Sequence, residues 1–316
     1  MNIVFMGTPD FAVPSLLGLI ENGHRILAVV TQPDRPKGRG KKIKYPPVKE
    51  IALENKISVL QPIKLKEEAF ITCLKSLNPD IIIVIAYGKI LPKEILSIPK
   101  NGCINLHASL LPAYRGAAPI NWAIINGEKK SGVTTMYMDT GLDTGDMILK
   151  DEIEIPEDMT AGELHDVLAD LGKEVLLNTI ENIQQKKVTR KAQNHEEHSY
   201  APMLDKNLGE INWNNSAEHI VNLIRGTNPW PGAHTFLMEE KMKLWKAKIY
   251  DGINDKSKPG TIIDYISNLG WIVKTGKGLI AIEEIQMPNN KKMSVDSFVR
   301  GHCVNIGTIL GKNGCE

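Results

Sequence analysis

Short apolar runs that alternate with helix-like stretches are the feature that most constrains the fold of this chain. Apolar strands are expected at 2–6, 24–31 and 79–87, the last with the run IIIVIA at its centre. Helical patterns lie between them, at 48–55 and 66–77. Strands that are separated by helices pair in parallel, and continuous apolar runs are typical of strands buried on both faces. The first half is therefore predicted to be a parallel α/β sheet covered by helices on both faces.

Three polar side chains stand out in the stretch 102–145. Asn105 and His107 alternate with apolar residues, so in an extended strand both point to the same face. Asp143 follows a second alternating run, 133–138, in a Gly-Leu-Asp-Thr-Gly turn whose glycines let the backbone bend sharply. The three side chains can therefore meet in one pocket at two strand ends.

Such a trio suits the attack of an amine on a carbonyl carbon. The Asn105 amide and a His107 N–H can donate to the developing oxyanion, while Asp143 orients the imidazole. No nucleophilic side chain is then required. Taken singly, each residue also has a structural interpretation, since a lone histidine near a strand is commonly a core residue and an aspartate in a glycine-rich turn commonly shapes that turn.

A basic loop follows the second predicted strand. Six of the ten residues from 35 to 44 are Lys or Arg, in a chain whose net charge is only +1. The flanking prolines and internal glycines predict an irregular loop, mobile when unbound. A solvated charged loop is one interpretation. The concentration of positive charge favours the other, a partner with a phosphate backbone.

The second half changes pattern after a long helix. Apolar residues at helical spacing predict a helix over 161–184, with Thr160 and Glu163 placed as a capping box. A polar run follows, and then a helix at 217–225 among short strands at 210–213, 235–238, 243–250, 260–266, 270–274 and 278–286. These strands predict a small antiparallel barrel. The expected domains are 1–184 and 208–316, with 185–207 as a linker.

Composition limits the other possibilities. The four cysteines form neither a C-x-x-C pair nor a ladder, which favours reduced thiols over structural zinc. The sequence His195-Glu196-Glu197-His198 is one residue short of the H-E-x-x-H zinc motif, so no metal site is expected. The N-terminus lacks a targeting pattern and the run 81–86 is too short to span a bilayer, which predicts a cytoplasmic protein without membrane association.

The longest motif carries a family resemblance. Residues 105–116 read Asn-x-His-x-Ser-Leu-Leu-Pro-x-Tyr-Arg-Gly, and Asp-x-Gly-x-Asp-x-Gly-Asp follows at 139–146. This pair of motifs resembles the active-site signature of the folate-dependent formyltransferases. The basic loop and the run GTNPWPGA at 226–233 also resemble that family. The resemblance implies a Rossmann-like catalytic domain followed by an OB-like β-barrel that binds tRNA.

Within that family the chain is most similar to the bacterial-type branch that formylates methionyl initiator tRNA for translation initiation. The resemblance implies 10-formyltetrahydrofolate as co-substrate, Asn105, His107 and Asp143 as catalytic residues, and no metal or redox cofactor. We expect the protein to act as a monomer. The implied folate contacts are Ser109, Leu110, Leu111, Pro112, Ala86, Tyr87 and Leu91. The implied tRNA contacts are Arg39, Lys41, Lys42, Arg35 and Lys37, with Arg39 entering the acceptor region.

Two other classes of function remain open. A relative with the same trio could formylate a small amine such as an amino sugar or glycinamide ribonucleotide. Such an acceptor would not need the basic loop or the barrel. Alternatively, the chain could be an RNA-binding module whose α/β domain is a scaffold, which would leave the Asn-His-Asp arrangement unexplained.

Overall fold

A computed structural model describes residues 1–37, 42–252 and 256–312 of the 316-residue chain. Internal contacts divide the chain into two compact units. Unit 1 comprises Met1–Pro119, Ser131–Ile153 and His165–Pro202; unit 2 comprises Ile120–Lys130, Glu154–Leu164 and Met203–Glu316. The chain therefore passes between the units several times.

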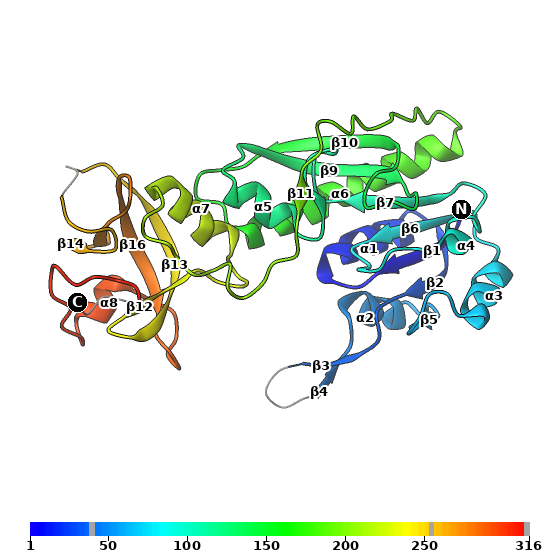
Figure 1. Ribbon diagram of the computed structural model, residues 1–316. Coiled ribbons are helices and arrows are strands. Elements are labelled where there is room, and N and C mark those ends of the chain that lie inside the picture. The colour runs from blue at the N-terminus through cyan, green and yellow to red at the C-terminus, as the bar shows by residue number, and fades with distance from the viewer. Residues whose placement is uncertain (38–41, 253–255, 313–316) are drawn as a thin grey trace. The chain divides into compact units, whose positions relative to one another are not determined.

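Unit 1 is built on a seven-stranded sheet with the order β10-β9-β7-β6-β1-β2-β5 (Figure 1). Its strands are β1 (Asn2–Gly7), β2 (Arg25–Val30), β5 (Val59–Leu60), β6 (Ile81–Ile85), β7 (Cys103–His107), β9 (Lys130–Tyr137) and β10 (Met147–Glu154). The five strands from β7 to β5 pair in parallel, which confirms the predicted parallel α/β sheet. β9 pairs antiparallel with β7. The alternating pattern of β9 predicted its faces but not its direction.

Helices cover both faces of this sheet, as predicted. The first half contributes η1 (Asp10–Ala12), α1 (Val13–Glu21), α2 (Pro47–Glu54), α3 (Glu68–Leu77) and α4 (Lys93–Leu96). One face packs residues such as Val4, Ile82 and Cys103 with Leu74 of α3 and Ile95 of α4 in one apolar cluster. The opposite face of β7 carries Leu106, and α6 (Ala161–Gln184) packs there so closely that a Cβ at Gly172 would lie 2.7 Å from the Leu106 side chain.

Helix α6 has the predicted bounds, Ala161–Gln184. The capping box is confirmed, because Thr160 N–H donates to Glu163 Oε2 over 2.8 Å and Glu163 N–H donates to Thr160 Oγ1 over 3.3 Å. Leu164, Leu168, Leu176 and Ile180 are fully buried, in keeping with the helical spacing. Val167 belongs to the same apolar pattern but is 42% exposed, so the pattern overestimates the width of the buried stripe.

The basic loop is partly regular, which corrects the expectation of an irregular segment. β3 (Arg35–Lys37) and β4 (Lys42–Lys44) pair antiparallel, with Arg35 opposite Lys44 and Lys37 opposite Lys42. The strands can pair because Pro36, the proline within β3, loses only its own N–H from the ladder. The hairpin projects from the sheet beside α2 (Figure 1). Residues 38–41, including Arg39 and Lys41, lie outside the described residues.

Much of the segment expected as a linker, 185–207, belongs to unit 1. Lys191 exchanges two backbone hydrogen bonds of 2.9 Å with Met147, and β11 (Tyr200–Ala201) pairs in parallel with β8 (Arg115–Gly116). Gln193 is buried, with 5% of its surface exposed. The polar composition predicts a linker, but here the polar groups find hydrogen-bond partners within the fold.

Unit 2 contains an antiparallel sheet with the order β12-β13-β16-β15-β14, to which β17 adds beside β16. Its elements are α7 (Ala217–Gly226), β12 (His234–Leu237), β13 (Glu240–Tyr250), β14 (Ile262–Ile266), β15 (Gly270–Lys274), β16 (Leu279–Gln286), β17 (Met293–Ser294) and α8 (Val295–Val299). Helix α5 (Pro119–Ile125) begins in unit 1 and continues into unit 2. The predicted separation into an α/β sheet and a smaller β fold is confirmed.

One predicted strand of unit 2 is wrong. Residues 210–213 form only a single bridge, between Glu210 and His234, because Trp213 already lies in a turn. Residues 307–311, near the C-terminus, form hydrogen bonds at both edges of the sheet. Gly307 and Leu310 donate to Ile262 and Gly260 beside β14, and Gly311 donates to Phe236 of β12. Both outer strands of the sheet are therefore partly covered, as in barrel-like folds.

Candidate active site

Two residues of the predicted trio lie near the carboxyl end of β7, one of the parallel strands. Asn105 is its third residue and His107 its last, and Asn105 stands beside Val84 of β6. Both side chains leave the same face of the strand and are largely buried, with 8% and 6% of their surface exposed. Ligands of open α/β sheets bind at this edge, near the point where the strand order reverses. Here that reversal occurs at β1, which has β2 on one side and β6 on the other.

Asp143 brings its carboxylate to both of these side chains. Asn105 Nδ2 donates to Asp143 Oδ1 over 3.4 Å, and Nδ1 of His107 lies 3.7 Å from Asp143 Oδ2. The first is a long hydrogen bond, whereas the second is within ion-pair range only. The structure therefore brings the three side chains together, although 38 residues separate Asn105 from Asp143.

The backbone conformation of the turn that carries Asp143 is fixed by several contacts. Asp143 has a φ of +54°, a left-handed conformation that asparagine and aspartate tolerate better than most residues. Asp139 Oδ1 accepts hydrogen bonds from Gly141 N and Thr144 Oγ1. A Cβ at Gly145 would lie 1.7 Å from the Tyr137 carbonyl oxygen, so only glycine fits there. These contacts explain the Asp-x-Gly-x-Asp-x-Gly spacing of the sequence.

The second ring nitrogen of His107 is also engaged. Nε2 lies 2.9 Å from the carbonyl oxygen of Tyr114, which can only accept a hydrogen bond, so Nε2 carries the proton. We expected a His107 N–H directed at an oxyanion. In this structure that N–H is instead satisfied by the protein, because the turn after β7 folds back over the ring.

The predicted folate segment, Ser109 to Pro112, is held in place mainly by hydrogen bonds to neighbouring residues of the protein. Ser109 Oγ donates to the Ala113 carbonyl over 2.6 Å, and Thr134 Oγ1 donates to the Ser109 carbonyl over 2.7 Å. Leu111 is fully buried and precedes a cis peptide bond to Pro112. Leu110 and Pro112 are partly exposed. These last two side chains are the ones available to a ligand.

The second predicted folate segment begins where β6 ends. Ala86 is exposed and has a φ of +46°, whereas Tyr87 and Leu91 are each 2% exposed. Burial raises the pKa of Tyr87 to about 12, and its hydroxyl finds no hydrogen-bond partner among the described residues. The Tyr87 carbonyl accepts from Gln32 Nε2 over 3.0 Å. Of this group, Ala86 alone presents its side chain openly.

A polar cluster anchors the base of the basic hairpin. Lys49 Nζ donates to Asp34 Oδ2 over 2.6 Å and to Gln61 Oε1 over 2.8 Å. The Lys49 and Gln61 contacts lower the pKa of Asp34 below its usual value. The Lys49 ammonium also lies 4.1 Å from the centre of the Tyr45 ring. These contacts fix the hairpin to α2.

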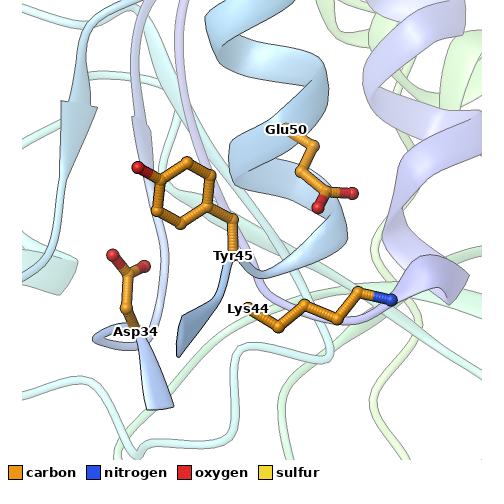
Figure 2. Close-up of a pocket in the computed structure, with 4 residues that line it drawn as sticks. All are labelled: Asp34, Lys44, Tyr45 and Glu50. Atoms are coloured by element: carbon orange, nitrogen blue, oxygen red, sulfur yellow. The ribbon is translucent and has the colours of Figure 1, made fainter. Parts of the chain in front are cut away.

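Beside this anchor is a hollow of about 370 Å³ lined by Asp34, Lys44, Tyr45 and Glu50 (Figure 2). Figure 2 shows Glu50 reaching in from α2 and the other three side chains coming from the two ends of the hairpin. None of the trio residues lines it. Of the predicted tRNA contacts, the backbones of Arg35, Lys37 and Lys42 lie in the paired strands, whereas Arg39 and Lys41 lie outside the described residues.

Comparison with known proteins identifies the family. A family profile described as "Formyl transferase" matches residues 1–180, and a second, "Formyl transferase, C-terminal domain", matches residues 203–303. The chain belongs to the formyltransferase family. Curated relatives include the methionyl-tRNA formyltransferase of Clostridioides difficile (strain 630), 57% identical over 98% of this chain and 100% of the relative. That of Acetivibrio thermocellus is 54% identical over 99% of this chain and 100% of the relative.

Solved formyltransferases share the fold at lower identity. The sugar 3N-formyltransferase WlaRD, crystallised with dTDP and 5-N-formyl-tetrahydrofolate, has a TM-score of 0.69 at 21% identity, covering 92% of this chain and 99% of that one.

Among the helices that the structure describes, none combines the length and apolar character needed to cross a bilayer. The described residues also contain no group of three His, Cys, Asp or Glu side chains arranged to hold a metal ion.

Sequence reasoning missed several residues that shape this site. Arg115, Gly116 and Gln193 all contact the Asp143 turn or one another. Arg115 and Gly116 lie inside the motif at 105–116 but have no reactive group that a pattern would single out. Gln193 lies in a polar run with no motif, so no local signal could have found it.

Proposed function

We propose that the chain transfers a formyl group from 10-formyltetrahydrofolate to the α-amine of methionyl initiator tRNA, supporting translation initiation. The observation that carries this proposal is the Asn105, His107 and Asp143 cluster, found in a chain that matches methionyl-tRNA formyltransferases along their entire length. The regions 1–180 and 203–303 also match the two formyltransferase family profiles.

The chemistry follows from the acceptor. An α-amine titrates near pH 8, so a useful fraction is neutral at working pH and can attack the formyl carbon directly. A C–N bond forms, and the bond between the formyl carbon and the folate nitrogen breaks. The proton lost by the amine is balanced by the proton that the folate nitrogen gains. No covalent enzyme intermediate is needed.

Asn105 and His107 would stabilise the tetrahedral oxyanion. The Asn105 amide has a second N–H beyond the one that faces Asp143, and this donor can face the oxyanion. His107 acts as an imidazolium held by Asp143, and its Nε2–H exchanges the Tyr114 carbonyl for the oxyanion during the reaction. A modest movement of the turn after β7 would accomplish this exchange.

The substrate contacts are assigned from the exposure of the predicted residues. We infer that the folate lies against Ala86, Leu110 and Pro112, whose side chains are open or partly open, with Ser109, Leu111, Tyr87 and Leu91 supporting this wall from inside. We assign the acceptor end of the tRNA to the basic hairpin, with Arg39 as the principal contact and Arg35, Lys37, Lys41 and Lys42 as phosphate contacts.

We further propose that 1–184 performs catalysis, that 208–316 contributes an OB-like surface for tRNA, and that the protein acts as a cytoplasmic monomer. A tRNA acceptor places the reaction where translation occurs. Two structural differences support this division. The first region contains the α/β sheet with the polar trio, and the second contains a separate antiparallel sheet.

One experiment tests the acceptor. Purified protein is incubated with 10-formyltetrahydrofolate and either methionyl initiator tRNA, methionyl elongator tRNA or an amino-sugar nucleotide, and formyl-methionine and formyl-sugar are measured by mass spectrometry. Rapid formylation of the initiator tRNA alone is expected. Formylation of the sugar with no product from the tRNA would overturn the proposal and favour the small-amine alternative.

A further inference from the structure

The geometry assigns a positioning role to Gln193, a residue in the segment 185–207 that carries no catalytic motif. We propose that Gln193, itself held by Arg115, fixes the Asp143 turn so that its carboxylate faces His107. This inference rests on the proposed function, because it concerns the same reaction.

The Gln193 side-chain amide is buried and fully hydrogen-bonded. Its oxygen accepts from Arg115 Nε over 3.1 Å and from Arg115 Nη2 over 2.7 Å. Its nitrogen donates to the Asp143 carbonyl and to the Gly145 carbonyl, each over 2.8 Å. Both lone pairs and both N–H bonds are therefore used, so the amide orientation is determined without ambiguity.

These four bonds join the two turns that determine the position of the Asp143 carboxylate. One is the turn 143–145, whose carbonyls Gln193 holds. The other is the turn 114–116, in which Gly116 N–H donates to Asp143 Oδ2 over 2.9 Å and the Tyr114 carbonyl accepts from His107. Arg115 lies between those two groups and is 2% exposed. Gln193 thus links the turn 114–116, which contacts His107, to the turn 143–145, which carries Asp143.

A glutamine is required at this position for a chemical reason. Glutamate could accept from Arg115 equally well, but it has no N–H to donate and would place its oxygens against two carbonyl oxygens. Gln193→Glu therefore keeps the buried Arg115 paired while removing both bonds to the Asp143 turn. A buried Arg115 guanidinium without a partner would destabilise the fold, and Gln193→Glu avoids this. Any loss of activity in this variant can then be attributed to a shift of the Asp143 turn.

The test is a double-mutant cycle. Gln193→Glu, Asp143→Ala and the double variant are compared with wild type for kcat and KM with methionyl initiator tRNA, for Tm, and for the pH dependence of kcat. Gln184→Glu, on the exposed end of α6, is the matched control for the added charge. We expect Gln193→Glu to lower kcat by about 10-fold to 100-fold with KM nearly unchanged and an altered pH profile. In the Asp143→Ala background the same substitution should have little further effect.

The outcomes are distinguishable. A wild-type protein that does not formylate the tRNA would overturn the proposed function. With an active wild type, a Gln193→Glu variant with unchanged kcat and pH profile would overturn the positioning role. So would effects of Gln193→Glu and Asp143→Ala that multiply, because Gln193 would then act independently of Asp143. A lowered Tm with normal kcat per folded molecule would show a purely structural role, which also contradicts the proposal.

Discussion

The backbone N–H of Gly116 lies 2.9 Å from Oδ2 of Asp143, the same oxygen that faces Nδ1 of His107. A backbone donor thus orients a side chain that the motif alone would place only approximately. Gly116 can occupy this position because its φ is +117° and because a Cβ there would lie 2.8 Å from the Ala201 carbonyl oxygen.

Substitution of Gly116 should therefore displace the Asp143 carboxylate. Gly116→Ala is expected to destabilise the fold by about 1–3 kcal/mol and to lower kcat by about 10-fold or more. Gly23→Ala is the matched control, since Gly23 has a φ of +73° but nothing within 4 Å of an added Cβ. It should cost only about 1–2 kcal/mol, with normal kcat. Equal kcat values for the two variants, measured alongside urea unfolding, would contradict the role of Gly116.

The trio itself should control turnover with little effect on folding. Asn105→Ala, His107→Ala and Asp143→Ala are each expected to lower kcat by about 10²-fold or more, the scale of a lost oxyanion donor or acid–base partner. His165→Ala is a suitable control, because this half-buried histidine faces Asp10 and Asp166. Near-normal turnover of a folded Asp143→Ala protein would disprove the support of His107 by Asp143.

The rate should rise with pH. The substrate amine has a pKa near 8, and only its neutral form attacks the formyl carbon, so the reactive fraction increases as the amine loses its proton. Single-turnover rates from about pH 6 to 9 provide the measurement, since they exclude product release. A flat profile would contradict the requirement for a neutral amine.

The cysteines should differ sharply in reactivity. Cys103 is 2% exposed, and burial raises the pKa of its thiol to about 12, so it stays neutral and unreactive at pH 8. Cys303 is exposed. Alkylation with iodoacetamide at pH 8, followed by peptide mass spectrometry, should label Cys303 within minutes and Cys103 only after unfolding. Rapid labelling of Cys103 in the native protein would show that β7 is less protected than its burial indicates.

The tRNA assignment depends most on Arg39. Arg39→Ala should greatly reduce formylation of methionyl-tRNA, and Arg39→Lys should restore little of it, because lysine lacks the planar pair of donors. Lys64→Ala, an exposed lysine elsewhere in unit 1, is the control for loss of one charge and should change little. Hydrolysis of 10-formyltetrahydrofolate to tetrahydrofolate and formate should be unaffected in both Arg39 variants. If the Arg39→Ala variant formylated tRNA normally at moderate salt, the basic loop would have to be interpreted as a solvated charged loop that does not bind tRNA.

The sequence by itself determined the features that depend on local patterns. Apolar runs separated by helical spacing predicted the α/β sheet, and Thr160 with Glu163 predicted where α6 begins. The alternation around Asn105 and His107 predicted that both side chains share a face. Each of these features is decided by residues a few positions apart, which is why periodicity and capping chemistry were sufficient.

Only the tertiary structure decided how the candidate site is held together. The antiparallel direction of β9, the Tyr114 carbonyl on His107 and the pairing of β3 with β4 all depend on how the chain returns on itself. Arg115 and Gln193 are 78 residues apart, yet their bond links the turns around Asp143. A buried amide and a buried guanidinium must satisfy their hydrogen bonds wherever partners are found, and no local pattern specifies partners at that separation.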